Sequence, residues 1–162
     1  MADWIEEGDR APAFTLPTHD GGTLSLKDLR GAPVVLYFYP KDDTPGCTRE
    51  ACGFRDAAKA LAGLDAVVLG VSRDSAERHA AFRTKYRLPF TLLVDADHAV
   101  AERYGAWREK TLYGKKSMGI VRSTFVIDAA GKVARVFRSV RPDGHAEQVL
   151  EVLRTIPIDF FP

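Results

Sequence analysis

The sequence predicts an α/β fold, a three-layer sandwich in which helices flank a mixed central sheet. Three short segments are continuously apolar, β-branched or aromatic, which suits strands that are buried on both faces. Helical patterns separate these segments, and strands that alternate with helices are typical of right-handed parallel crossovers. The three predicted buried strands span residues 34–39, 66–71 and 91–94.

Three helices are predicted around these strands. A long helical pattern begins at Pro45 and ends at Leu64, and a second runs over 75–86 with apolar residues at helical spacing. After the third strand, Asp97 is a favoured N-cap residue for a short helix over 98–104. We expect these helices to cover the faces of the sheet.

The later part of the chain changes character. Two short strands, 123–128 and 133–138, flank a connection that contains Gly131, which is typical of an antiparallel hairpin. A last helix is predicted over 145–154. Parallel crossovers followed by a hairpin and a closing helix match the thioredoxin-like order.

The two ends of the chain complete the predicted organisation. Residues 14–16 and 23–26 flank a glycine-rich turn and predict an N-terminal hairpin. No repeat or linker interrupts the chain, so a single domain is predicted over 1–162. Its tail, 156–162, is unusually apolar and is expected to pack on the domain or on a partner.

Composition restricts the possible function classes. Hydrophobic residues make up 46% of the chain and charged residues 28%, an ordinary composition for a soluble globular protein. The N-terminus is acidic and lacks an apolar stretch, so no secretory signal is predicted. No apolar run approaches the roughly 20 residues that a membrane helix needs. A soluble, cytoplasmic protein without a membrane partner is expected.

One basic stretch could suggest a nucleic-acid site. It runs from Arg108 to Arg122 and includes Lys110, Lys115 and Lys116. The whole chain, however, carries 23 Lys and Arg against 22 Asp and Glu, and the sequence shows no wider basic face. The stretch is therefore interpreted as a solvated loop over the active site, and no nucleic-acid partner is expected.

Two cysteines, Cys47 and Cys52, lie five residues apart. They are too few for a disulfide framework, and a reducing cytosol would not keep one closed. A zinc site needs about four ligands at characteristic spacings. The four histidines are scattered, so neither a metal nor another cofactor is expected; they are His19, His79, His98 and His145. Either both thiols are buried and inert, the commoner fate of cysteine, or the local sequence makes one reactive.

The residues before Cys47 predict a reactive thiol. Thr44 is a favoured N-cap type and Pro45 a favoured first helical residue, so Cys47 falls at the third helical position. Unpaired N–H groups and the positive end of the helix dipole favour an anion there, and a thiolate is the nucleophilic form of cysteine. Gly46 leaves space beside the sulfur for a small substrate.

Nearby charges modify this prediction. Asp42 and Asp43 disfavour a thiolate if they are close to it, so a cation is needed near the sulfur. Arg49 and the more distant Arg122 are the candidates.

The spacing of the cysteines prevents a disulfide while the helix is intact. In an ideal helix, residues five apart have Cα atoms roughly 8.6 Å apart. A disulfide needs less than about 7 Å. Gly53 costs about 1 kcal/mol relative to alanine within a helix, so it either assists unwinding there or permits close packing against a neighbour.

Long segments of the chain resemble one protein family. The pattern Pro40-x-x-x-Thr44-x-x-Cys47 is similar to the peroxiredoxin active-site signature. The run over 39–52 resembles the peroxiredoxin Q, or bacterioferritin comigratory protein, subfamily, and the likeness continues over 113–128 and begins at 8–14. Nearly the whole chain is covered, except the apolar tail.

The resemblance implies roles for individual residues. Cys47 would be the peroxidatic cysteine; Thr44 would hydrogen-bond the sulfur and the peroxide, and Pro40 would shield them from water. Arg122 would stabilise the thiolate and the charge on the peroxide oxygens, and Glu50 would orient an arginine. Without the resemblance, these residues would be interpreted as a helix cap, a strand stop, a surface cation and a solvated helix charge.

The implied activity is that of a thioredoxin-dependent peroxidase. It would reduce hydrogen peroxide and organic hydroperoxides through a Cys47 sulfenic acid, with antioxidant defence as its role. Cys52 would attack the sulfenic acid once the helix start unwinds, and thioredoxin or a similar dithiol would reduce the disulfide. Resolution within one chain removes one need for a dimer, so a monomer is expected.

Two other functions remain open on the sequence. A disulfide oxidoreductase of thioredoxin type normally uses Cys-x-x-Cys, whereas here four residues separate the thiols. In a redox-sensing binding module, oxidation of Cys47 would unwind the helix and change a partner surface.

Overall fold

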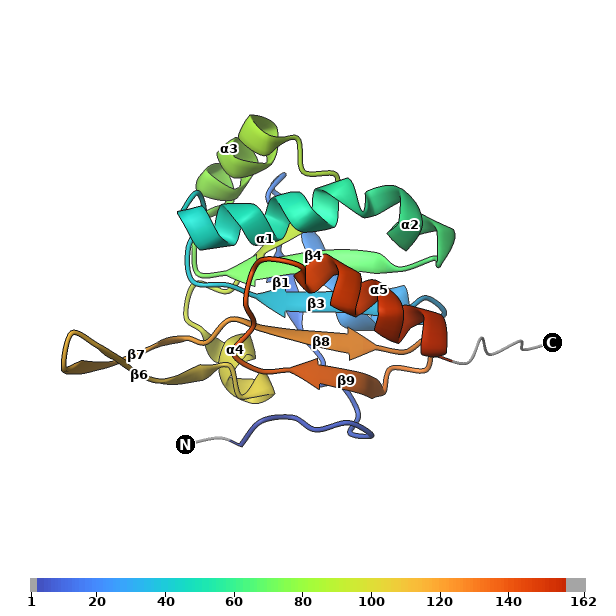
Figure 1. Ribbon diagram of the computed structural model, residues 1–162. Helices are drawn as coiled ribbons and strands as arrows, with labels where there is room; N and C mark the ends of the chain where they lie inside the picture. The colour runs from blue at the N-terminus through green and yellow to red at the C-terminus, as the bar shows by residue number, and fades with distance from the viewer. Residues whose placement is uncertain (1–2, 157–162) are drawn as a thin grey trace.

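A five-stranded mixed sheet forms the centre of the fold, in the order β5-β4-β3-β8-β9 (Figure 1). The computed structural model describes residues 3–156. β3 pairs in parallel with β4, and β4 with β5, whereas β8 is antiparallel to both β3 and β9. The predicted mixed sheet is therefore confirmed. Its strands are β3 (Val34–Phe38), β4 (Val67–Ser72), β5 (Thr91–Val94), β8 (Ser123–Ile127) and β9 (Val133–Phe137).

The side chains of β3 alternate between two separate apolar cores. Leu36 and Phe38 lie in one core with residues of the N-terminal segment and of α4 (Ala99–Tyr104). Val35 and Tyr37 lie in the other, with residues of the remaining helices. Helices thus cover the face of the sheet that faces the viewer in Figure 1. These helices are α1 (Pro45–Asp56), α2 (Ala58–Gly63), α3 (Ala76–Tyr86) and α5 (His145–Thr155).

Two predicted helix boundaries are wrong. The helix predicted over 45–64 is two helices, because the chain leaves helical geometry at Ala57, with φ −91° and ψ 3°. The short helix before residue 105 is capped by His98, which adopts a left-handed conformation, rather than by Asp97. Asp97, one residue before the N-cap, still accepts a hydrogen bond from the N–H of Ala99, the first helical residue.

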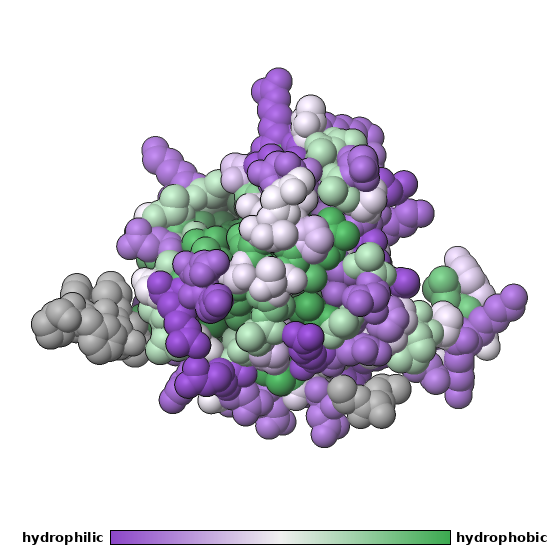
Figure 2. Space-filling view, turned by 180° about the vertical axis from the view of Figure 1, so that it is seen from behind, coloured by the Kyte–Doolittle hydropathy of each residue, from purple (hydrophilic) through white to green (hydrophobic). Residues whose placement is uncertain are grey.

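The basic stretch before Arg122 is a hairpin rather than the predicted loop. Its strands are β6 (Trp107–Leu112) and β7 (Lys115–Ile120), and they project from the body of the molecule (Figure 1). Both turn residues, Tyr113 and Gly114, have positive φ, the conformation that two-residue hairpin turns require. Figure 2 shows the hairpin standing out with an apolar spot among hydrophilic side chains. Because residues 111–118 are exposed, the outer part of the hairpin carries no apolar alternation that the sequence could reveal.

The ends of the described chain agree with the prediction where they can be compared. The N-terminal hairpin pairs β1 (Thr15–Pro17) with β2 (Thr23–Ser25), and the 3-10 helix η1 (Leu26–Leu29) follows it. Ile156 packs against the core beneath α1 and α5, whereas the rest of the apolar tail lies outside the described residues. Within residues 3–156, no helix is long and apolar enough to cross a membrane.

Candidate active site

The chain leaves β3 and turns into α1 with the geometry that the sequence predicts. Thr44 is the N-cap, with extended backbone at φ −99° and ψ 155°, and Pro45 is the first helical residue. Cys47 is therefore in the first turn, and it is 2% exposed. The Thr44 hydroxyl makes no capping bond and donates instead to the Lys41 carbonyl oxygen at 2.9 Å. The predicted bond from this hydroxyl to the sulfur is thus not formed.

Arg122 joins the sulfur to a buried carboxylate. Its Nη2 donates to Cys47 Sγ at 3.3 Å, and its Nη1 donates to Glu50 Oε1 at 2.6 Å. Glu50 follows Cys47 by three residues, so the two side chains lie on the same face of α1. The planar fork of the guanidinium can reach both groups at once. The fold thereby brings together three predicted site residues from segments more than 70 positions apart.

Burial changes the protonation of this cluster. Removal from water raises the pKa of Glu50 to about 7, although the charge and hydrogen bond of Arg122 act in the opposite direction. Burial also disfavours the charge of Arg122, but Glu50 and Cys47 outweigh it and raise the pKa of the guanidinium. Glu50 Oε2 has no hydrogen-bond partner among the described residues. The Arg122 guanidinium is thus shared between two acidic groups.

Gly46 leaves room for Arg122 in its observed position. A Cβ atom at this position would lie 3.1 Å from Arg122 Nη2, tighter than nine in ten such contacts, so the guanidinium would have to shift by a few tenths of an ångström. The sequence assigned Gly46 to substrate access, and the structure adds this packing reason. Pro40, which directly follows the buried Tyr39, is half-buried at the same end of the sheet.

The other predicted cation, Arg49, does not contact the sulfur. Its Nε pairs with Asp143 Oδ1 at 3.1 Å on an exposed part of the surface. The two aspartates before the helix are instead paired with residues of α3. Asp42 contacts His79, and Asp43 contacts Lys85 and Tyr86.

Lys110 lies near this site, in the stretch that the sequence predicts to lie over it. It projects from β6, and its Nζ donates to the Ile120 carbonyl oxygen at 2.6 Å. Burial and the charge of Arg122 lower its pKa, whereas the charge of Cys47 raises it. The hairpin therefore brings a second cation close enough to interact with the sulfur. The sequence predicted a solvated loop over the active site, and it did not indicate that Lys110 is half-buried there.

Cys52 lies further along the same helix. Both cysteines are free, with Cys47 buried and Cys52 half-buried, and both belong to the uninterrupted α1. A groove of about 440 Å³ runs beside Cys52, between α1 and the start of α5. A Cβ atom on Gly53 would lie 3.8 Å from the nearest atom, Ala146 Cβ, which is ordinary contact. Close packing therefore does not require glycine at this position.

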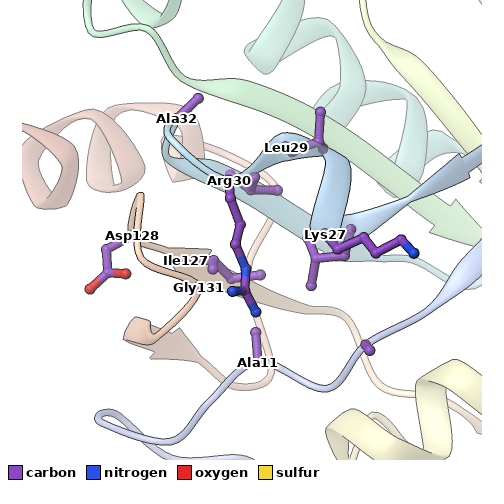
Figure 3. Close-up of a pocket in the computed structure, with 11 residues that line it drawn as sticks. Ala11, Lys27, Leu29, Arg30, Ala32, Ile127, Asp128 and Gly131 are labelled. Atoms are coloured by element: carbon purple, nitrogen blue, oxygen red, sulfur yellow. The ribbon is translucent and has the colours of Figure 1, made fainter.

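A second cavity lies away from this cluster. It measures about 40 Å³ and lies between η1, the N-terminal segment and the end of β8 (Figure 3). Arg30 extends along it past Gly131, while Asp128 points away. This volume accommodates only a few water molecules. Among residues 3–156, no three His, Cys, Asp or Glu side chains are grouped so that they could hold a metal ion.

A buried cysteine at the start of a helix, whose sulfur accepts a hydrogen bond from an arginine, is typical of thiol-based redox enzymes with a thioredoxin-like sheet. Comparison with known proteins specifies the class. Residues 7–136 match the model of the AhpC/TSA family. A putative peroxiredoxin Bcp of Coxiella burnetii is 55% identical over 146 residues, which are 90% of this chain and 97% of the relative. Peroxiredoxin Bcp of Bacillus subtilis is 49% identical over 150 residues, which are 93% of this chain and 96% of the relative.

Solved structures give the same result. A cysteine-to-serine mutant of Xylella fastidiosa PrxQ superposes with a TM-score of 0.89 at 34% identity, covering 94% of this chain and 98% of that one. The Xanthomonas campestris bacterioferritin comigratory protein superposes with a TM-score of 0.85 at 36% identity, covering 95% of this chain and 98% of that one. The chain belongs to the AhpC/TSA family, as a peroxiredoxin of the Bcp or Q type. It is thus an oxidoreductase of the thiol-dependent peroxidase class.

Proposed function

We propose that Cys47 reduces the peroxide and that Cys52 of the same chain resolves the product. The observation that carries this proposal is the pair of contacts from Arg122, which joins the Cys47 sulfur to the buried Glu50. A cysteine in the first turn of a helix, beside a fixed cation, is in the environment that stabilises its nucleophilic thiolate.

In the first step, the Cys47 thiolate attacks the hydroxyl-bearing oxygen of the peroxide. An S–O bond forms as the O–O bond breaks, and the leaving oxygen takes the electron pair and a proton and departs as water or an alcohol. Arg122 and the N–H groups of the first turn stabilise the developing negative charge. Glu50 holds Arg122 in place, Thr44 turns its hydroxyl from Lys41 to the peroxide, and Pro40 limits access of water.

In the second step, the first turns of α1 unwind. The Cys52 thiolate then attacks the sulfur of the Cys47 sulfenic acid, forms the disulfide and releases hydroxide, which is protonated to water. The free state of both cysteines in an intact helix supports this order, because the bond requires a closer approach than the helix permits.

The disulfide is then reduced by an external dithiol, for which we propose thioredoxin or a protein like it. The groove beside Cys52 is where such a partner could approach the disulfide. The substrates we propose are hydrogen peroxide and organic hydroperoxides, and alkyl peroxide reduction is described for the Xanthomonas campestris relative. We also propose that the protein works in the cytoplasm as a monomer, without nucleic acid, in antioxidant defence.

Peroxide consumption coupled to thioredoxin and its reductase tests the proposal. Wild type should turn over continuously, and Cys47→Ser should not turn over at all. Cys52→Ser should consume about one equivalent of peroxide and then stop. Retained turnover in Cys47→Ser would exclude the assignment of Cys47, and unchanged steady-state turnover in Cys52→Ser would exclude Cys52.

The same proteins distinguish the alternative functions. A disulfide oxidoreductase would catalyse insulin reduction by a small dithiol, which a peroxidase of this type should not accelerate. A redox-sensing module would form the disulfide with peroxide but would not be reduced by thioredoxin at a rate that supports turnover.

A further inference from the structure

The loop between β3 and α1 is fastened to α3 by buried and surface contacts. This loop, residues 40–44, precedes Cys47 and ends at the helix N-cap. Asp42 Oδ2 lies 2.6 Å from His79 Nδ1, and both side chains are almost fully buried, with exposures of 2% and 0%. Nearby, Asp43 accepts hydrogen bonds from Lys85 Nζ and the Tyr86 hydroxyl, both at 2.7 Å. The loop is thus attached to three positions on one helix.

The hydrogen bonds of His79 determine where its protons lie. Its Nε2 lies 2.8 Å from the Leu93 carbonyl oxygen. A carbonyl oxygen only accepts, so Nε2 carries a hydrogen. The Nδ1 atom and the Asp42 carboxyl group then share one further proton across the 2.6 Å contact. Every polar atom of the imidazole is satisfied, which links α3 and β5 to the loop.

Asp42 is held on its other sides as well. The Tyr39 hydroxyl donates to Asp42 Oδ1 at 2.5 Å, and burial raises the pKa of this phenol, which keeps it a donor. The Asp42 N–H donates to Asp74 Oδ1 at 3.0 Å. A buried carboxylate with these partners is costly to release, because each broken contact leaves a polar group unpaired.

We propose that the contacts of Asp42 and Asp43 with α3, centred on the buried Asp42–His79 pair, are a positioning device that holds the start of α1 folded and thereby limits how readily Cys47 can reach Cys52. This inference rests on the proposed function of the two cysteines. For the disulfide to form, the first turns of α1 must unwind. This segment lies between the loop that is anchored on α3 and the part of α1 beyond Cys52. An anchored loop keeps Thr44 at the N-cap position, so it stabilises the closed state in which Cys47 meets peroxide. Loosening the anchor raises the population of the open state, in which the disulfide forms.

The test compares Asp42→Asn with wild type in two measurements. The first is hydrogen exchange of the amides in residues 48–51 of the reduced protein, where the hydrogen bonds of the first helical turns begin, and it needs no peroxide chemistry. We expect exchange there to be at least tenfold faster in the variant, while β3 remains as protected as in wild type. The second is the rate of disulfide formation after one equivalent of hydrogen peroxide, followed by rapid acid quench and mass spectrometry. We expect that rate to rise at least tenfold, with less sulfinic acid on Cys47 at excess peroxide.

Matched controls separate the anchor from a general loss of stability. Asp143→Asn breaks the exposed ion pair of Arg49 on the same helix and should leave both measurements within twofold of wild type. If Asp42→Asn does not fold, Asp43→Asn takes its place. Asp43 has φ 58°, a conformation that asparagine adopts readily, so that variant removes the charge that pairs with Lys85 and weakens the bond from Tyr86 without straining the backbone.

The outcomes are distinct. Unchanged exchange over 48–51 in a folded anchor variant would overturn the proposed positioning role, whatever the cysteines do. Faster exchange with unchanged disulfide formation would also overturn it, because unwinding would then not limit resolution. If no disulfide forms even in wild type, the proposed function fails, while the exchange measurement still reports on the anchor.

Discussion

Replacing Arg122 with glutamine should slow the reaction of Cys47 with peroxide strongly. The change removes the guanidinium that donates to Cys47 Sγ at 3.3 Å and leaves a shorter, uncharged amide side chain. A hydrogen bond to a charged group contributes about 1.5–3 kcal/mol. Coulomb attraction at 3.3 Å is about 5 kcal/mol at an effective dielectric constant of about 20. Since part of this interaction is already present before the reaction, we expect a barrier higher by about 2–4 kcal/mol, a roughly 30- to 1,000-fold slower reaction.

The rate constant can be measured by competition with a haem peroxidase for hydrogen peroxide, in a Cys52→Ser background that isolates the first step. Arg49→Gln is the matched control, because Arg49 occupies the same helix but pairs with Asp143 in solvent. We expect this control to remain within twofold of the parent protein. If Arg122→Gln, shown to be folded by circular dichroism, also reacts within threefold of the parent, the contact does not activate the sulfur and the reasoning is refuted.

Three further predictions concern the active site and the core beneath the helices. The pKa of Glu50 is raised from 4.5 to about 7, so the folded state holds this proton to higher pH than the unfolded state. Relative to Glu50→Gln, the wild type should therefore lose about 3 kcal/mol of unfolding free energy as the pH rises from 4.5 to 8, measured by urea denaturation; parallel pH profiles would contradict this. Gly70→Ala should lower stability by about 1–3 kcal/mol in the same assay, because its Cβ would lie 2.9 Å from the buried Tyr37 hydroxyl. Lys110→Met should slow the reaction of Cys47 with hydrogen peroxide roughly threefold in the competition assay, as expected of a charge that interacts with the sulfur without contacting it. An unchanged rate would show that Lys110 does not contribute to this reaction.

Much of the fold could be predicted because its buried strands are uniformly apolar. The run over 34–38 contains only aliphatic and aromatic residues, and the structure buries all of them. The hairpin of β6 and β7 was missed for the opposite reason, since residues 111–118 are exposed on both faces and carry no pattern. Ala57 gave no sign that it ends a helix, because alanine itself favours helical geometry.

The start of α1 could be predicted from local residues alone. Thr44 and Pro45 are strong helix-start signals, and the structure places both where they were expected. The contact of Arg122 with Cys47 spans 75 positions, which no local rule can bridge. By charge alone, Arg122 was only one of two candidate cations, and the family resemblance assigned it to the sulfur. His79 was interpreted as one of several scattered histidines. Its helical spacing with the apolar Phe82 and Tyr86 was the signal that it lies on the buried face of α3.

The central claim is that Cys47 reacts first and that Cys52 of the same chain resolves it. It is tested most directly by adding one equivalent of hydrogen peroxide to the reduced protein and mapping disulfides in a non-reducing digest. The account predicts a Cys47–Cys52 bond within one chain, formed at a rate that does not depend on protein concentration. A bond between chains, or two cysteines that remain reduced while the peroxide disappears, would contradict it.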